Sequence, residues 1–174
     1  NRFRNGQPTR FVFTADGESV YFLRSGPRDR AMALHRADVR AGQETRVLTA
    51  AALLSGDAEV LSPEERARRE RQRMFAGGIT AFELLADDRA LLVPLSGRLF
   101  VYDLPAGPAR ELPLPAGAVL DPRLSPDRRQ VAYVRDGDIF VFDLESNREL
   151  RITATANENL QNGLAEFVAA EEMG

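Results

Sequence analysis

Short apolar runs alternate with turn-forming residues along the chain, and three stretches do so in the same order. They read ADGESVYFLRS (15–25), ADDRALLVPLS (86–96) and PDRRQVAYVRD (126–136). Each begins with a turn rich in Asp, Gly and Arg and continues into a β-branched or aromatic run. This order is typical of a β-strand entered from a tight turn. The pattern therefore predicts a chain built mainly of short strands.

The second and third stretches also continue alike, as GRLFVYDLPAGPARELPL and GDIFVFDLESNRELRIT. Asp87 and Asp127 lie 40 residues apart, and so do Asp103 and Asp143. Two equal spacings indicate an internal repeat rather than chance similarity. A repeat of about 40 residues with four short strands is typical of a β-propeller blade, whose faces are buried only against its neighbours.

The repeat predicts an all-β fold, namely part of a β-propeller with about three four-stranded blades. The strands of the first blade are expected at 10–14, 19–24, 33–38 and 45–49. We expect blade 1 at about 10–49, a helical insertion at about 50–78, blade 2 at about 79–115 and blade 3 at about 118–153. Propellers have at least about four blades. We therefore expect the ring to need residues beyond Gly174, and this chain alone to associate through its open flanks or to be marginally stable.

The insertion predicts an α-helix within LSPEERARRERQRMFAGG. Its start and end signals are Ser62 as N-cap, Pro63 at the first helical position, Glu65 completing a capping box, and Gly77 or Gly78 as the end. Glu65 and Arg69 are four residues apart in the orientation that favours an ion pair. These signals together predict an inserted, Arg-rich helix.

This predicted helix has no apolar stripe. Between Glu64 and Arg73 only Ala67 is non-polar, so we expect the helix to lie in solvent or to line a wet cavity. Arg66, Arg69 and Arg73 share one face, because offsets of three and seven return to nearly the same angle. Two interpretations stay open: a solvated surface element, or Arg side chains that donate hydrogen bonds to a ligand carbonyl or carboxylate.

The chain finishes with AEFVAAEEMG, for which we expect a short helix at about 158–173. Glu171 and Glu172 lie near its closing end, where the helix dipole disfavours negative charge. One interpretation is a hydrated, fraying terminus. In the other, two carboxylates about 100° apart on one turn close around an ammonium group, which has three donors and no acceptor.

Composition and charge exclude several classes of function. The chain has 174 residues, 44% of them apolar, a net charge of −3, one histidine and no cysteine. This net charge does not indicate binding to nucleic acid or to an anionic membrane surface. No apolar run approaches the length of a membrane span. One histidine without cysteine cannot build a metal site of the usual spacing, so we expect no metal and no cofactor. We expect that histidine, His35, to be partly buried in the strand MALHRADV.

No G-x-S-x-G elbow, Gly-rich phosphate loop or Ser/His/Asp set occurs in the chain, so it has no catalytic apparatus of its own. The Asp residues of ADG, ADD and SPD are expected to form turns.

The segments LSPEERARRERQRMFAGGIT, the blades and NGLAEFVAAEEMG, in that order, resemble the N-terminal β-propeller region of the dipeptidyl peptidase IV family. That family lies within the prolyl oligopeptidase superfamily of serine exopeptidases. The resemblance implies that Glu171 and Glu172 bind the free N-terminal ammonium of a peptide. It also implies that an Arg of the inserted helix donates to a substrate carbonyl, and we favour Arg69, then Arg66 and Arg73.

For a longer parent protein, the resemblance implies release of dipeptides after a penultimate Pro or Ala. A Ser-His-Asp triad on an α/β-hydrolase domain C-terminal to this chain would carry the chemistry, so this chain alone should be inactive. The resemblance also implies peptide substrates with a free N-terminus and a homodimer when full-length. With the Arg-only basic composition, it leads us to expect a periplasmic or secreted bacterial protein, with a cytoplasmic one as the alternative. The competing hypothesis is a non-catalytic propeller that scaffolds protein partners.

Overall fold

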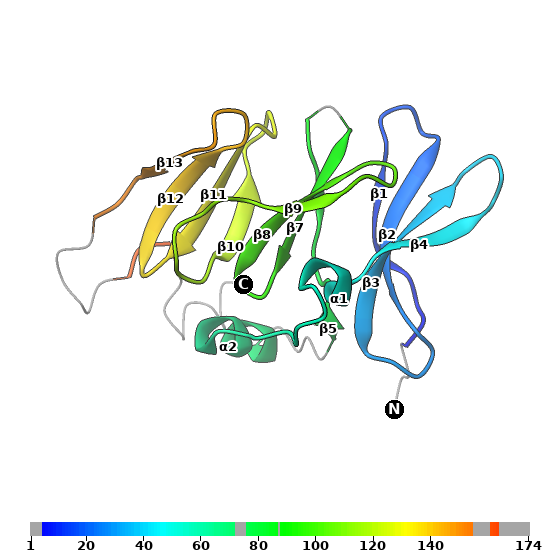
Figure 1. The fold of residues 1–174 in the computed structure, drawn as a ribbon, viewed down its shortest axis with the longest axis horizontal. Coiled ribbons are helices and arrows are strands. Elements are labelled where there is room, and N and C mark those ends of the chain that lie inside the picture. The colour runs from blue at the N-terminus through cyan, green and yellow to red at the C-terminus, as the bar shows by residue number, and fades with distance from the viewer. Residues whose placement is uncertain (1–4, 72–75, 87, 155–160, 164–174) are drawn as a thin grey trace. The chain divides into compact units, whose positions relative to one another are not determined.

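The computed structural model describes residues 5–71, 76–86, 88–154 and 161–163. Three antiparallel sheets follow one another along the chain, each an up-and-down meander of four strands (Figure 1). The predicted all-β fold with about three four-stranded blades is therefore confirmed. No helix among the described residues is long and apolar enough to cross a membrane.

Blade 1 contains β1 (Thr9–Phe13), β2 (Ser19–Ser25), β3 (Ala31–Asp38) and β4 (Glu44–Leu48). Blade 2 contains β6 (Glu83–Leu84), β7 (Ala90–Leu95), β8 (Arg98–Asp103) and β9 (Ala109–Glu111). Blade 3 contains β10 (Leu120–Leu124), β11 (Gln130–Arg135), β12 (Asp138–Asp143) and β13 (Arg148–Arg151). Between blades 1 and 2 lie α1 (Ala50–Leu53), α2 (Pro63–Arg71) and the two-residue strand β5 (Gly77–Gly78).

The short C-terminal helix expected at about 158–173 falls mostly outside the described residues. Of that span the structure describes 161–163, which form a bend rather than a helix.

The chain divides into two compact units. The first comprises residues 1–60 and 75–111, which include blades 1 and 2 with α1 and β5. The second comprises residues 61–74 and 112–174, which include α2 and blade 3. Helix α2 therefore belongs to the second unit, whereas the segments that precede and follow it in sequence belong to the first.

Blades 1 and 2 share one apolar core within the first unit. Blade 1 contributes Tyr21, Leu23 and Leu34, blade 2 contributes Leu91, Val93 and Phe100, and Leu53 and Leu54 join them from the end of α1. These strand residues alternate along β2, β7 and β8 because successive side chains of a strand point to opposite faces. Leu34 is fully buried, opposite Leu23 in the β2–β3 register.

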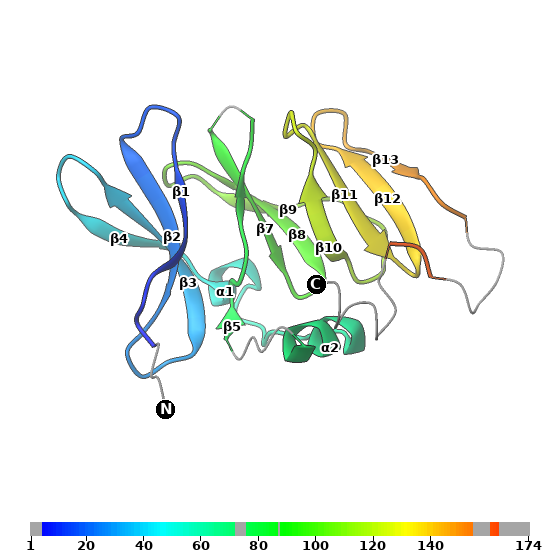
Figure 2. The same ribbon diagram turned by 180° about the vertical axis from the view of Figure 1, so that it is seen from behind.

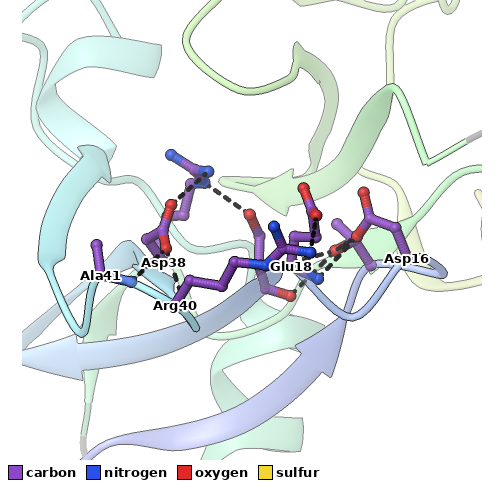
Figure 3. Close-up of polar contacts among 8 residues, drawn as sticks. Asp16, Glu18, Asp38, Arg40 and Ala41 are labelled. Carbon is purple, nitrogen blue, oxygen red and sulfur yellow. Dashed lines mark hydrogen bonds and ion pairs between the residues drawn. The ribbon is translucent and has the colours of Figure 1, made fainter.

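An Asp of the repeated motif closes the first turn of a blade. In blade 1, a carboxylate oxygen of Asp16 accepts from the Thr14 hydroxyl at 2.6 Å and from the Glu18 amide at 2.9 Å (Figure 3). In blade 3, Asp127 accepts in the same way from the Ser125 hydroxyl at 2.5 Å and from the amide two residues later at 3.1 Å. The prediction that these Asp residues form turns is confirmed for both blades.

A second Asp closes the turn between the last two strands of a blade. Asp38 accepts from the backbone amides of Arg40 and Ala41 at 3.0 and 2.8 Å (Figure 3). Asp143 accepts from the two equivalent amides of blade 3 at 3.2 and 2.8 Å. The turns are therefore held by local bonds that each repeat encodes for itself.

Replacing Leu34 by Ala should lower the free energy of unfolding by about 2 to 5 kcal/mol, because a fully buried leucine leaves both lost contacts and a cavity. Chemical denaturation of the purified chain measures the change. Leu150, 64% exposed, provides the matched control, and Leu150→Ala should change stability by less than about 0.5 kcal/mol. Equal effects of the two substitutions would contradict the assignment of the core.

Lowering the pH should weaken the first turns of blades 1 and 3 and so lower the free energy of unfolding. Hydrogen bonds from Thr14 and Ser125, and then from backbone amides, hold the pKa of Asp16 and of Asp127 below its usual value. As the pH falls below about 4, the unfolded chain binds protons before the folded chain does, so the free energy of unfolding falls. The double variant Asp16→Asn, Asp127→Asn should flatten this slope in denaturation curves taken from pH 5 to 2.5. An unchanged slope would show that the two turns do not contribute.

Candidate functional site

Helix α2 begins where the sequence predicts. The Ser62 hydroxyl accepts from the Glu65 amide at 3.2 Å, and the Ser62 carbonyl accepts from the Arg66 amide at 2.9 Å. Pro63 occupies the first helical position, where its missing N–H leaves no helical bond unmade. The predicted N-cap is therefore confirmed, and it sets where the Arg residues of the helix fall.

Two of the candidate arginines, Arg66 and Arg69, lie in different surroundings. The Arg69 Nε donates to Glu65 Oε1 at 2.9 Å, and the two side chains are only 8% and 13% exposed. Arg66 is exposed. On the Arg69 side the helix is therefore covered and does not lie in open solvent, which was one of its two expected surroundings. A charged side chain can be covered there because it is paired with an opposite charge one turn away.

The chain after α2 returns to blade 1 as a strand. Gly77 and Gly78, expected to end the helix, instead form β5, which pairs in parallel with the first residues of β3 (Figure 1 and Figure 2). Gly78 has φ of +74°, and a Cβ there would lie 2.5 Å from the Met32 carbonyl oxygen. Only glycine allows this approach. The glycine expected as a helix cap is thus required by a strand pairing instead.

Glu59 connects the two ends of the insertion. Its Oε2 accepts from the Gly78 amide at 2.8 Å, so the segment before α2 meets the segment after it. The next residue, Val60, donates its amide to the Ser96 hydroxyl at 3.2 Å. These two contacts lie within the first unit and hold the residues just before α2. The sequence did not predict them.

The remaining predicted site residues, Arg73, Glu171 and Glu172, lie outside the described residues. Of the five candidates, the structure thus describes Arg66 and Arg69, and it tests no contact between either of them and the glutamate pair.

A buried ion pair links two strands of blade 3. Arg135 donates from both terminal nitrogens to Glu149, at 2.7 and 2.8 Å, and its guanidinium lies 4.1 Å from the centre of the Phe140 ring. The Tyr133 hydroxyl also bonds to Glu149. The hydrogen bond from Arg135 lowers the pKa of Glu149, and burial raises the pKa of Tyr133. The cluster therefore joins β11 and β13 through charged hydrogen bonds beside the Phe140 ring.

Asp138, at the start of β12, carries a second network that sequence reasoning missed. Its side chain is 4% exposed and accepts from Thr153, Asn162 and Arg151. The repeat contained a signal for it. Forty residues earlier blade 2 has the ion pair Arg98–Glu111, at 3.0 Å, and the same positions in blade 3 are Asp138 and Arg151 with the charges reversed.

His35 is partly buried, as the alternating pattern predicts. Its side chain is 15% exposed and stacks on Phe22, with ring centroids 5.6 Å apart. Its Nδ1 lies 2.8 Å from a carboxylate oxygen of Glu44, and burial lowers the pKa of the imidazole. A cavity of about 380 Å³ beside this pair is also lined by Arg24 and Arg46, and of the described candidates neither Arg66 nor Arg69 lines it.

Titratable side chains do not gather into a metal site in the described part of the chain: no three His, Asp or Glu residues there could hold one ion.

The fold and the repeat define a class, the β-propellers. Among solved structures, TolB from Acinetobacter baumannii aligns with 90% of this chain and 34% of its own, at 17% identity and a TM-score of 0.52. Dipeptidyl peptidase 4 from Porphyromonas gingivalis aligns with 90% of this chain and 20% of its own, at 21% identity and a TM-score of 0.51. At these identities the likeness concerns the fold. The chain spans about a third and a fifth of the lengths of these two proteins.

The family itself is identified from the sequence. The family model of the dipeptidyl peptidase IV (DPP IV) N-terminal region matches residues 86–174, half of the chain. The chain therefore belongs to the family of dipeptidyl peptidase IV N-terminal regions, and it forms a peptidase-related propeller domain.

Breaking the Glu65–Arg69 pair from one side should destabilise the protein more than removing both charges. Glu65→Ala takes a buried partner from the guanidinium and should cost about 3 to 5 kcal/mol. The double variant Glu65→Ala, Arg69→Met should recover a substantial part of that loss, because a methionine fills similar space without a charge. A double-mutant cycle by chemical denaturation measures the coupling. Additive effects of the two substitutions would show that the pair is not coupled.

Proposed function

We propose that this chain is the substrate-binding propeller portion of a longer serine exopeptidase that releases N-terminal dipeptides from peptides with a penultimate Pro or Ala. The observation that carries the proposal is the family match over residues 86–174, which spans the Glu171–Glu172 pair together with blade 3. Glu171 and Glu172 bind the N-terminal ammonium of the peptide. The substrate is thereby held at its end rather than along its length.

The chemistry of an ammonium group suits two adjacent carboxylates. It has three donors and no acceptor, whereas ionised carboxylates only accept. Hydrogen bonds between charged partners contribute about 1.5 to 3 kcal/mol each. Fixing the chain end at one point also fixes the distance to the scissile bond, so the length of the released product follows from the position of the pair. Holding a reacting group in place lowers the barrier by reducing the entropy lost in the reaction.

Arg69 supplies the second contact in this proposal, a donor to a carbonyl near the substrate N-terminus. What supports it is the Glu65 carboxylate at 2.9 Å, which orients the planar guanidinium before any ligand binds. A guanidinium has five N–H donors in a fixed fork, so a group held through Nε keeps a defined direction for the others. Arg66 and Arg73 are the second choices.

The chemical step belongs, in this proposal, to a Ser-His-Asp triad on an α/β-hydrolase domain encoded after Gly174. The reading frame beyond Gly174 tests this directly. We expect a G-x-S-x-G elbow followed by Asp and then His. A continuing frame without these residues would contradict the peptidase proposal and favour a non-catalytic propeller.

Removal of both carboxylates should disable the longer enzyme. The double variant Glu171→Gln, Glu172→Gln keeps the size of both side chains but removes their charge, and kcat/KM for a Gly-Pro amide should fall by about 100-fold or more, because two charge-assisted contacts are lost. Steady-state kinetics measure this. The matched substrate control is the N-acetylated amide, which has no ammonium group and should be a poor substrate for both proteins. Full activity of the double variant would refute the ammonium contact.

A further inference from the structure

Asp138 connects the body of blade 3 to the segment that follows its last strand. One carboxylate oxygen accepts from the Thr153 hydroxyl at 2.8 Å and from the Asn162 side-chain amide at 3.0 Å. The other pairs with Arg151 on β13. The Asp138 side chain is 4% exposed, so its carboxylate accepts these bonds away from bulk water, although the Arg151 side chain itself is half exposed.

Asn162 is held twice, since its backbone amide also donates to the Gly137 carbonyl at 2.8 Å. Two bonds from one residue to two adjacent residues fix both its position and its orientation. The neighbouring Gly163 has φ of +77°, and a Cβ there would lie 2.6 Å from Val134 Cγ2 and 2.9 Å from Ile139 Cγ1. The Asn162–Gly163 bend therefore lies directly against β11 and β12.

The equivalent positions of blade 2 do not have this arrangement. There Arg98 and Glu111 form the cross-strand pair with side chains 41% and 44% exposed. In both blades the residue two positions further along the strand is aligned alike, with Phe100 opposite Glu111 and Phe140 opposite Arg151. The reversal places an acceptor, instead of a donor, at the buried end of the pair. Only an acceptor at that position can receive the Asn162 amide.

We propose that Asp138, through Asn162, is a positioning residue that fixes the origin of the chain segment bearing Glu171 and Glu172. The inference rests on the proposed function of the glutamate pair. Glu171 follows Asn162 by nine residues, which can span at most about 32 Å, so a fixed point at Asn162 limits where the carboxylates can be. Loss of that point leaves the carboxylates chemically intact but less well placed for the ammonium group.

Two variants of the longer protein test this. Asp138→Asn removes the charge and replaces one of the two acceptor oxygens by a donor, and Asn162→Ala removes the side-chain amide and leaves the pair of Asp138 with Arg151. Each should raise KM for a Gly-Pro amide by about tenfold or more while kcat changes less than about threefold, as expected for weaker substrate binding. Each should also speed backbone hydrogen exchange at residues 161–163. Arg98→Gln, which breaks the exposed pair of blade 2, is the matched control and should alter neither quantity.

The outcomes separate the two proposals. Faster exchange at 161–163 with unchanged KM in both variants would show that the contact is only structural and would overturn the inference. If Asp138→Asn does not fold, Asn162→Ala decides alone. The double variant Glu171→Gln, Glu172→Gln is measured in parallel. Full activity of that variant would mean that the proposed function itself fails, and the positioning role would fail with it.

Discussion

A four-stranded sheet has two faces, and this chain makes both of them apolar. Strand β7 reads ALLVPL, and five of its six residues are buried. A single blade cannot cover such a strand, so the sheet is stable only when other parts of the protein pack on it. Within the first unit this constraint is met by the core between blades 1 and 2, to which Leu34 and Leu91 contribute. The candidate site residues consequently lie outside the sheets along the sequence, in the insertion and in the segment after blade 3.

Helix α2 of the insertion solves a different problem, because this helix has no apolar stripe to bury. Its stability comes from caps, a strand pairing and ion pairs, each of which has a specific geometry. The Ser62 cap fixes its start, β5 fixes its return, and Glu65 makes a covered Arg69 tolerable. Such contacts position a charged side chain more narrowly than an apolar patch would, since a hydrogen bond has a direction and the hydrophobic effect has none.

The sequence predicted the parts of the fold that depend on local chemistry. The spacing of Asp87 and Asp127 revealed the blades, and Ser62 with Pro63 located α2, because turns and caps are encoded within a few residues. The role of Gly78 was predicted wrongly, since it depends on Met32, which is distant in sequence, and the sequence alone did not show that Arg69 is covered. Asp138 was missed for another reason: its signal is a change of charge between two repeats rather than a residue that they share. Of the candidate site, the sequence located Arg66 and Arg69 on α2, and the position of Glu171 and Glu172 stays a prediction.

The reversed pairs of blades 2 and 3 also bear on how the chain avoids folding incorrectly. Repeats of similar sequence can exchange equivalent strands, a characteristic error of repeat proteins. If β12 paired with β9 in place of β13, Asp138 would face Glu111, and if β8 paired with β13, Arg98 would face Arg151. In the native register the paired side chains lie diagonally rather than directly opposite, but they still reach each other, so like charges at these positions would disfavour the wrong pairing. The charge reversal between blades 2 and 3 gives blade 3 its buried carboxylate. The same reversal therefore favours pairing of each outer strand within its own blade.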